Sequence, residues 1–550
     1  MSKRHARGIW WVKRDFRLHD NAALCQALDE CEHVAALFII EPSLCVAEET
    51  SFFHYHAWQQ AGEALHKRLK RAGADLQLWL GEVVDVFDII QLHRGFDAIY
   101  SHEETGSDIT FRRDRLMSHW ATRNNVRWQE LPQNGVIRGL RDRDKRIALV
   151  NERLKQSTIL AAPEAISQWQ TDTSEPTRHT HTQSATEQNG PTARALTEWP
   201  AFDQITQQRI DQRICLDQLQ SITEADASRD LHSFLTRRGI AYSGGISSPN
   251  TAFESGSRLS AHLAWGTISL RQIFHMLHAT ERELAQDQSY SARRWRKSLR
   301  AFQSRLHWHD HFMQRLESAP WMQFKSINPA YRELSYEDDE RTVIAWASGQ
   351  TGIPLVDACI RCLAATGFVN FRMRAMLVSV ACFGLAQSWQ RVQHPLARLF
   401  RDYEPGIHLS QVQMQAGVVG INTLRVYNPH KQLLDHDPDA RFIKQWVPEL
   451  REFEPVQIAR YADQPLGSYP SPPDNLHTNT KMMRDRVYAI RASDAGKQAS
   501  QQVLKAHGSR LPGNDRHRSS ATRQTAAKAQ SPTNRNGFRS SPGQMDLDLE

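Results

Sequence analysis

The fold is decided by the stretch GIWWVKRDFRLHDNAAL, which covers residues 8–24. Its first five residues, Gly8–Val12, form an apolar run of strand length, and a charged turn follows at once. Helical patterns such as His56–Arg71 separate four further strand candidates: Val34–Ile40, Leu76–Leu80, Ala98–Tyr100 and the half-apolar Val126–Leu131. Strands that alternate with helices indicate a parallel α/β sheet. No G-x-G-x-x-G follows the first strand, so the usual dinucleotide-binding loop is missing.

Changes in composition divide the rest of the chain. Residues 168–198 are rich in Thr, Ser, Gln and Pro, which is typical of a mobile linker. The pattern over 201–490 is mostly helical, and few apolar residues follow it. We therefore predict a Rossmann-like parallel-sheet α/β domain over residues 1–135, an interdomain linker over 136–200, an all-α domain over 201–495 and a disordered basic tail over 496–550.

The chain of 550 residues carries 68 Lys and Arg against 61 Asp and Glu, a formal net charge of +7. This excess fits an anionic partner, with nucleic acid as the first candidate. A soluble basic protein without such a partner is the alternative, because part of the excess lies in the tail. No apolar run of about 18 residues predicts a membrane span, and no signal-peptide core follows the N-terminus. Seven cysteines suit a reducing compartment, so we expect a cytoplasmic protein.

A second informative stretch, EPGIHLSQVQMQAGVVGINTLRVYNP, covers Glu404–Pro429. It contains no Asp or Lys and a single Arg, but many amides, glycines and small residues. A solvated loop would carry more charge, and an amphipathic helix would show an apolar stripe with a period of 3.6 residues. Neither pattern is clean, which raises the question of what this neutral segment packs against.

Hydroxyl-bearing and small residues precede a predicted helix in SGSRLSAHLAWG, residues 255–266. Backbone N–H groups, serine hydroxyls and Arg258 at a helix start are typical of a phosphate site. Taken alone, the segment is better explained by an ordinary helix cap at Ser255 or Ser257.

Two Cys and His patterns suggest metal binding without completing a site. Cys359 and Cys362 form a lone C-x-x-C with no second pair. In HWHDH, only His307 and His311 share a helix face, and no third ligand is evident. We predict no metal, and core or substrate-facing roles for these side chains.

Four segments, in the same order, resemble the photolyase/cryptochrome flavoproteins. WWVKRDFRLHDNAAL (10–24) resembles the family's opening, and SGSRLSAHLAWGTIS (255–269) resembles its flavin-phosphate segment. TGIPLVDACIRCLAATGF (351–368) resembles its signature helix hairpin, and LRVYNPHKQLLDHDPDARFIKQWVPEL (424–450) resembles the end of its flavin domain. The match covers most of residues 8–490. It implies an N-terminal α/β domain, a long linker and a helical domain that holds FAD.

The resemblance implies light-driven chemistry. Photolyases use reduced, blue-light-excited flavin to pass an electron to a pyrimidine dimer in DNA, whereas cryptochromes use the flavin for signalling. We expect a monomeric FAD-dependent photolyase whose partner is DNA with UV photoproducts, cyclobutane dimers being favoured. The alternatives are a sensory cryptochrome, which would signal through a protein partner that the sequence does not identify or through its tail, and a nucleic-acid-binding protein without flavin. The segment His102–Thr105 departs from folate-type sites, so no antenna chromophore is assigned.

The resemblance also implies which residues bind the cofactor. Ser257 and Ser260 would contact the phosphates, Arg374 would lie near the flavin ring and Asp402 would accept from its edge. Glu404–Pro429 resembles the segment along the ring, whose neutral face favours amides and small residues. The predicted cofactor-binding set is Tyr242, Gly256, Ser257, Arg258, Leu259, Ser260, Arg372, Arg374, Asp402, Gly406 and Asn428.

Several positions depart from the family's usual residues on a gap-free count. In the flavin segment, Gly406 replaces the Asn or Asp that faces flavin N5, Ser410 a flavin-proximal Trp, Val412 a lesion-flanking Trp, and Phe400 the Asp that pairs with the Arg at 374. In the lesion pocket, Arg305 replaces the dimer-binding Glu, Phe368 a Trp and Phe371 an Asn, and Asn370 replaces the first of the paired histidines of (6-4) photolyases.

These departures define the predicted catalytic set, Trp389, Trp308 and Arg305. Without the Trp at 410, photoreduction needs another relay. The candidates are Trp308, Trp321, Trp346 and Trp389. Trp389 keeps the family's usual spacing from Arg374, and core packing is the commoner role for the other three. Arg305 would attract DNA phosphates or an anionic lesion, the alternative being a structural salt bridge. Trp308, Phe368 and Phe371 would stack flipped bases.

Overall fold

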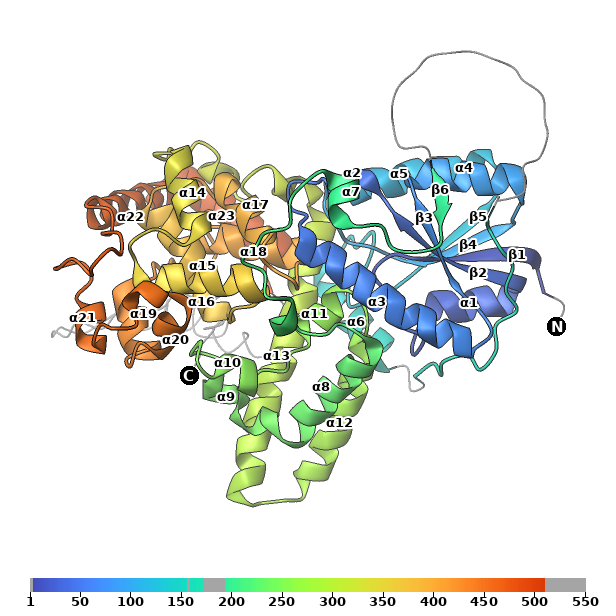
Figure 1. Cartoon of the computed structure of the whole chain (residues 1–550), viewed down its shortest axis with the longest axis horizontal. Helices are drawn as coiled ribbons and strands as arrows, with labels where there is room; N and C mark the ends of the chain where they lie inside the picture. Colours follow the sequence, from blue (N-terminus) through green and yellow to red (C-terminus); the bar gives the residue numbers. More distant parts are fainter. Residues whose placement is uncertain (1–2, 156–158, 173–192, 510–550) are drawn as a thin grey trace, which may run out of the picture.

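A six-stranded sheet in the order β5-β4-β1-β2-β3-β6 forms the N-terminal domain. The computed structural model describes residues 3–155, 159–172 and 193–509. The first five strands are parallel: β1 His5–Val12, β2 Cys31–Ile40, β3 Leu76–Leu80, β4 Ala98–His102 and β5 Arg127–Leu131. Helices α1 (Ala22–Glu30) and α3 (Phe52–Arg71) cover one face, and α4 (Val83–His93) and α5 (Asp108–Arg123) cover the other (Figure 1). The predicted parallel α/β sheet is confirmed.

Both faces of the sheet are buried, which explains its apolar strands. In β1, Trp10 and Val12 pack in the cluster with α1 and α3, while Ile9 and Trp11 pack in the cluster with α4 and α5. A strand that is covered on both sides has no polar alternation, so it reads as a continuous apolar run.

The connection after the sheet is partly fixed on it, which corrects the expectation of a mobile linker over residues 168–198. Trp169 is buried, and its indole N–H donates to the carbonyl of Gly8 at 2.8 Å. Strand β6 (Arg194–Leu196) pairs antiparallel with β3. The covered edge and the buried indole offset the ordering cost that the polar composition indicated. Residues 173–192 lie outside the described residues.

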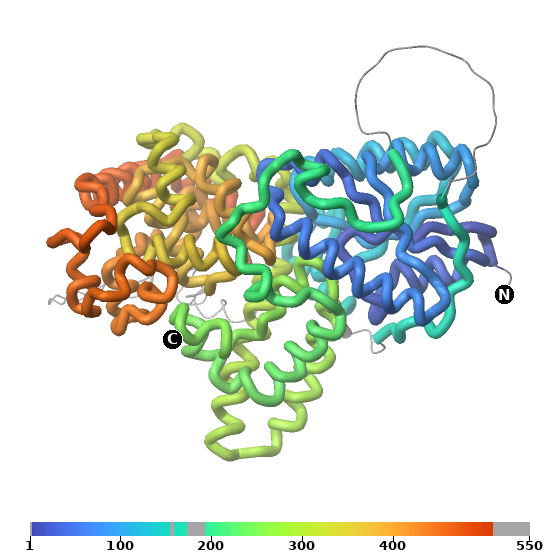
Figure 2. The backbone as a smooth tube through the Cα atoms, viewed as in Figure 1, coloured from blue at the N-terminus to red at the C-terminus, as the bar shows by residue number. Residues whose placement is uncertain are grey.

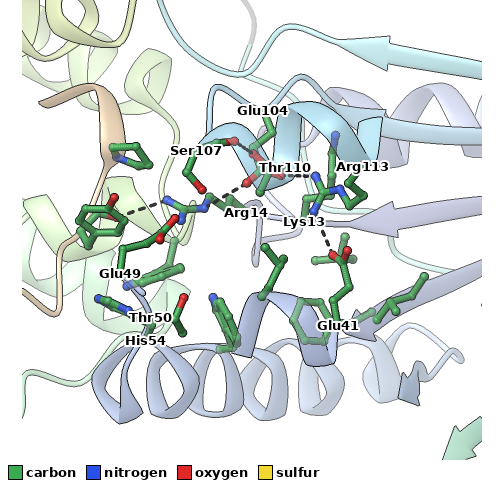
Figure 3. Close-up of a pocket in the computed structure, with 18 of the residues that line it drawn as sticks. Lys13, Arg14, Glu41, Glu49, Thr50, His54, Glu104, Ser107, Thr110 and Arg113 are labelled. Carbon is green, nitrogen blue, oxygen red and sulfur yellow. Dashed lines mark hydrogen bonds and ion pairs between the residues drawn. The ribbon is translucent and has the colours of Figure 1, made fainter. Parts of the chain in front are cut away.

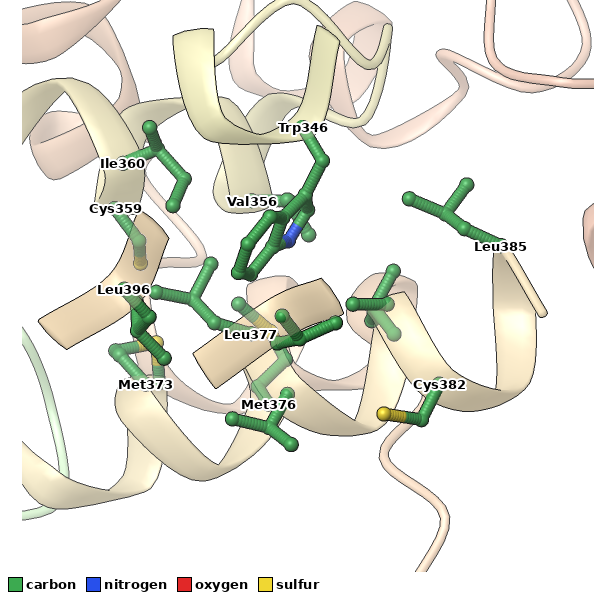
Figure 4. Packing of buried hydrophobic residues seen from close by; sticks show 14 of the residues in the cluster. Trp346, Val356, Cys359, Ile360, Met373, Met376, Leu377, Cys382, Leu385 and Leu396 are labelled. Carbon is green, nitrogen blue, oxygen red and sulfur yellow. The ribbon is translucent and has the colours of Figure 1, made fainter. Parts of the chain in front are cut away.

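The C-terminal domain is helical, as predicted, and packs around one large apolar core. Figure 4 shows part of this core, where Trp346, Met376 and Leu377 meet. The helices that supply it include α14 Glu340–Ser348, α15 Pro354–Thr366, α16 Phe371–Ser379, α17 Trp389–Ala397, α18 Pro405–Gln415, α20 Arg441–Trp446, α22 Leu476–Ala492 and the π-helical turn Val380–Gly384.

An arm of three helices projects from the rest of the molecule (Figures 1 and 2). It consists of α8 (Glu224–Thr236), α12 (Leu270–Ala285) and the N-terminal half of α13 (Tyr290–Ser318). The other half of α13 enters the middle of the protein and packs on α18. Short helices link these parts: α2 Pro42–Cys45, α6 Arg146–Lys155, α7 Phe202–Thr206, α9 Tyr242–Gly245, α10 Ala252–Ser255, α11 Ser260–Ala264, α19 Pro429–His436 and α21 Pro455–Ala459.

Helix α23 (Asp494–His507) corrects the expectation of disorder from residue 496. Ala499, Val503 and His507 are buried at a spacing of four residues, and Ser493 caps the helix by accepting from the N–H of Gly496. The apolar stripe is short and lies among glutamines, so composition alone indicates disorder. Residues 510–550 of the predicted tail lie outside the described residues.

Within the described part of the chain, no helix has both the length and the apolarity required to cross a membrane. The same residues contain no group of three or more His, Cys, Asp or Glu side chains placed to hold a metal ion.

Candidate cofactor site

A cavity of about 300 Å³ lies between the segment from α9 to α11 and helices α13, α16 and α18. Its size is that of a small-molecule site. The structure brings most of the predicted site residues together around it: Tyr242, Gly256, Ser257, Arg258, Leu259, Ser260, Arg305, Trp308, Arg374 and Asp402. Four predicted residues do not line it: Arg372, Trp389, Gly406 and Asn428. Sequence reasoning did not select four polar lining residues for this site: His309, Asn370, Glu404 and Gln411.

The turn before α11 presents its backbone to the cavity. Arg258 has a φ of 63°, in the left-handed region that a bulky side chain rarely adopts. Its guanidinium lies over the ring of Phe253 and pairs with Glu254 at 2.9 Å. Arg238, which we did not predict, holds the turn by donating to the carbonyls of residues 256 and 257. The turn therefore offers hydroxyls and peptide groups, while the charge of Arg258 is already paired.

Arg374 and Asp402 form a bidentate ion pair in the wall of the cavity. The two nitrogen–oxygen distances are 2.9 and 3.0 Å. The guanidinium lies 4.2 Å from the centre of the Phe400 ring and 5.6 Å from that of Phe368. On the gap-free count, Phe400 occupies the position of the carboxylate that usually pairs with this arginine. The pair exists, but Asp402 makes it, two residues later along the chain.

His309 and Glu404 form a second buried ion pair across α13 and α18. His309 Nε2 lies 2.9 Å from Glu404 Oε2, and Nδ1 lies 3.3 Å from Asp310 Oδ1. Burial alone would lower the pKa of His309, but the two carboxylates raise it to about 10. The imidazole is therefore a fixed cation. The sequence pattern HWHDH suggests a metal motif, and nothing in it indicates the contact with Glu404.

Two buried oxygens that belong to cavity residues have no hydrogen-bond partner among the described residues. These are Oδ1 of Asn370 and Oε1 of Gln411. The amide nitrogen of Asn370 donates to the carbonyls of Ile246 and Ser247, so its orientation is fixed. Unpaired buried acceptors are costly, which indicates that a ligand with polar N–H groups satisfies them.

The chain matches two family models. Residues 8–140 match the DNA photolyase domain, and residues 302–496 match the FAD binding domain of DNA photolyase. The chain belongs to the photolyase/cryptochrome family. It is 35% identical to the deoxyribodipyrimidine photo-lyase of Thermus thermophilus over 205 residues, which is 37% of this chain and 45% of that relative. The chain thus spans less than half the length of this relative.

Two other comparisons extend over most of the chain. It is 25% identical over 460 residues to the deoxyribodipyrimidine photo-lyase of Alkalihalophilus pseudofirmus, which covers 80% of this chain and 87% of that protein. Its fold is similar to the cryptochrome of Synechocystis, with a TM-score of 0.71, 21% identity and coverage of 88% of this chain and 100% of that one. The predicted fold class, an α/β domain with a helical FAD-binding domain, is confirmed.

The cavity residues fit FAD, the cofactor of this domain. The unpaired oxygens of Asn370 and Gln411 suit N–H donors at the edge of a flavin or adenine ring. The turn at Ser257 suits phosphates, and Arg374 with Asp402 supplies a rigid polar wall. Both charges of that wall are paired, so the face stays close to neutral.

Helix α18 explains the uncharged stretch that follows Glu404. The side chain of Gln413 is fully buried, donates to the carbonyls of Met322 and Lys325 and accepts from the N–H of Ile327. Its neighbour Gln411 borders the cavity. The helix is surrounded on nearly all sides, so it needs amides that bond to backbone rather than one apolar stripe.

The predicted residues that do not line the cavity make contacts elsewhere in the helical domain. Asn428 caps α19 by accepting from the N–H of Lys431. Trp389 is buried, and its indole donates to Ser326 Oγ at 3.1 Å. Arg372 lies within electrostatic range of Tyr427 and His436. The relay role of Trp389 remains a prediction.

Gly406 faces α13 instead of the cavity, which corrects its predicted place beside the flavin. A Cβ built on Gly406 lies 2.8 Å from both the Cα and the Sδ of Met313 and 3.1 Å from the carbonyl oxygen of Phe312. Glycine is required here because the backbones of α13 and α18 touch.

Gly406→Asn is therefore expected to destabilise the protein by about 1–3 kcal/mol, the usual cost of overpacking, and more if α13 cannot shift. Urea unfolding followed by circular dichroism measures it. Gly139→Asn is the matched control, because Gly139 has open space around it and Asn tolerates its φ of 69°. Equal stability of the two variants would contradict the close approach.

A smaller cavity of about 60 Å³ lies between the sheet and the helical domain (Figure 3). Arg113 pairs with Glu41 at 2.9 Å and with Glu104 at 2.6 Å, and Arg14 lies 3.4 Å from Glu104. Arg14 also donates to the carbonyl of Tyr403 in the helical domain. Glu104, from the segment without an antenna pattern, thus takes part in ion pairs at the domain junction.

Proposed function

We propose that this protein is an FAD-dependent DNA photolyase that uses blue light to split pyrimidine dimers, with cyclobutane dimers as the favoured substrate. One observation carries the proposal: a single cavity combines a near-neutral wall suited to flavin with an aromatic and cationic wall suited to a flipped lesion. Bound FAD, when reduced and excited, supplies the electron that splits the dimer. The protein's own residues bind, orient and shield the two partners.

The aromatic wall centres on Trp308. Its ring stacks on that of Phe312, with centroids 5.4 Å apart and planes 30° from parallel. Such a supported ring offers a rigid face for a base taken out of the DNA stack. Phe368 and Phe371 line the same cavity, as the resemblance suggested.

Arg305 supports binding of an anionic partner. It lines the cavity and makes no ion pair with any residue in the described ranges. A cation beside stacking rings suits the phosphate of a flipped nucleotide. The salt-bridged alternative for Arg305 therefore lacks support from the structure.

The arm supplies further cations on the same helix. Arg293, Arg294, Lys297 and Arg300 are exposed on α13 and form no ion pair with the residues that the structure describes. Unpaired surface cations that lead toward a cavity suit the phosphate backbone of DNA.

The decisive test is repair of an oligonucleotide with one defined thymine cyclobutane dimer by the purified, flavin-reduced protein. We expect normal thymines to return in blue light and not in the dark. FAD that is bound and photochemically active, without repair of either the cyclobutane or the (6-4) lesion, would overturn the proposal.

That outcome would favour a cryptochrome-type photoreceptor, which is the second candidate. The observation behind it is Arg305, a cation at a position where the resemblance implies a dimer-binding carboxylate. The similarity of fold to the Synechocystis cryptochrome is compatible with this function.

Trp308→Ala is expected to weaken binding of dimer-containing DNA by about 10- to 100-fold, because loss of one stacking ring costs roughly 1–3 kcal/mol. Fluorescence anisotropy with damaged and undamaged duplexes measures the change. Trp321→Ala is the control, since Trp321 is 41% exposed and lies outside the cavity. If the variant loses affinity for undamaged DNA to the same extent, Trp308 contacts the DNA duplex and not the lesion.

A further inference from the structure

Four buried cationic or basic side chains meet behind the aromatic wall of the cavity. This buried cation cluster consists of Arg146 of α6, His311 and Arg315 of α13, and His507 of α23, each less than 9% exposed. The ring of His311 lies 5.1 Å from that of Trp308. None of the four lines the candidate FAD cavity, so the cluster is a separate feature.

Arg315 has the fewest partners. Its exposed fraction is 2%. Nη2 contacts the Nε2 of His311 at 3.2 Å and the carbonyl of His507 at 3.4 Å. Nε and Nη1 have no hydrogen-bond partner among the described residues. Three N–H donors of a buried guanidinium therefore point at no acceptor, which is rare in a folded protein.

His311 lies at the centre of the cluster and shows a surplus of donors. Its Nε2 lies 3.2 Å from Nη2 of Arg315, and its Nδ1 lies 3.2 Å from Nη2 of Arg143. A neutral imidazole has one acceptor nitrogen and one donor nitrogen, whereas guanidinium nitrogens only donate. In one of these two contacts of His311, an imidazole N–H therefore faces a guanidinium N–H, with no acceptor between them.

Within the cluster, His311 and Arg315 have no carboxylate as a counter-charge. Four cationic or basic groups lower the pKa of His311 besides burial, and no carboxylate raises it. The pKa of Arg315 is lowered to about 10 by burial alone, so no carboxylate compensates its charge. Asp310 acts on Arg146, and its Oδ1 accepts from the N–H of Gly135. Unpaired buried charge is strongly unfavourable unless an anion joins it.

The side-chain nitrogens without partners are of a chemical kind that binds one class of ligand. The Nε of Arg146 and the Nδ1 of His507 also lack partners, alongside Nε and Nη1 of Arg315. Two guanidinium groups, with an imidazole nitrogen that donates in one of its two tautomers, are groups that bind tetrahedral oxyanions, since each oxygen accepts two or more hydrogen bonds. We propose that the buried cation cluster is a binding site for a phosphate group, held chiefly by Arg315.

The test is the thermal stability of the full chain in phosphate titrations, with chloride at matched ionic strength as reference. Phosphate is expected to raise the Tm of the wild type by about 2 °C in a saturable way. Arg315→Met should abolish the saturable rise or weaken the apparent affinity at least about tenfold. Arg123→Met, at the exposed end of α5 and outside every proposed binding surface, should leave the rise unchanged.

Undamaged duplex DNA in the same assay identifies the source of the phosphate. If duplex DNA raises the Tm in an Arg315-dependent way and free phosphate does not, the site binds a phosphate of a DNA strand. If free phosphate raises the Tm and duplex DNA does not, the site binds free phosphate. No saturable effect of either on the wild type would overturn the proposal, and this result does not depend on the folding of any variant. An equal rise in Arg315→Met would overturn it too.

Discussion

Asp402→Asn is expected to yield a protein that purifies with little FAD and unfolds more easily. The substitution removes the charge that holds Arg374 at 2.9 and 3.0 Å while it preserves side-chain size. Asp402 is 6% exposed as a side chain, and two phenylalanine rings flank the guanidinium. Breaking a buried pair from one side leaves an uncompensated charge and costs about 3–5 kcal/mol.

Two measurements separate the effects of Asp402→Asn. The ratio of flavin to protein absorbance reports cofactor retention, and urea unfolding of flavin-depleted protein reports the intrinsic loss of stability. Glu340→Gln is the control, because Glu340 pairs with Arg391 at 2.7 Å but is 73% exposed. That exposed pair should contribute less than about 1 kcal/mol. Normal flavin content in Asp402→Asn would show that the Arg374 wall does not hold the cofactor.

The sheet could be predicted because each of its strands is recognised from a few consecutive residues. A parallel strand covered on both faces needs apolar residues at every position, so β1 and β2 appear as uninterrupted runs. Strand β6 was not predictable, because its three residues carry no period. Its place depends on the free edge of β3, a feature of the assembled sheet.

The turn at Ser257 could be located from the sequence, since its small and hydroxyl-bearing residues are consecutive, and its phosphate role remains a prediction. The His309–Glu404 pair could not be predicted, because its members are 95 residues apart and meet only where α13 crosses α18. The position of Gly406 also depends on a contact between distant segments, so the sequence alone did not predict it. Counting placed it at the flavin, but the close contact of two helix backbones decides its role.

The stability of the protein is expected to fall as pH rises from about 6.5 toward 10, in a way that depends on His309. Its pKa is raised to about 10 in the folded protein, mainly by Glu404 and Asp310. A histidine has a pKa near 6.5 when unfolded. The stabilisation is therefore complete below about pH 6.5 and is lost as the pH passes through the folded value. The shift corresponds to roughly 5 kcal/mol.

Glu404→Gln tests this linkage without changing side-chain size. It removes the main carboxylate, so the pKa of His309 should fall and the pH dependence of stability should flatten. Urea unfolding at several pH values gives the free energy of unfolding for the wild type and the variant. We expect a large difference at pH 6 that shrinks toward pH 10.

Glu48→Gln provides a matched control on the surface. Glu48 lies 3.2 Å from His394 and is 81% exposed, so its removal should change stability by less than about 1 kcal/mol. His309→Gln should flatten the pH dependence as Glu404→Gln does, because either change removes the titrating pair. If the free energy of unfolding of the wild type exceeds that of Glu404→Gln by the same amount from pH 6 to pH 10, His309 is not the charged partner.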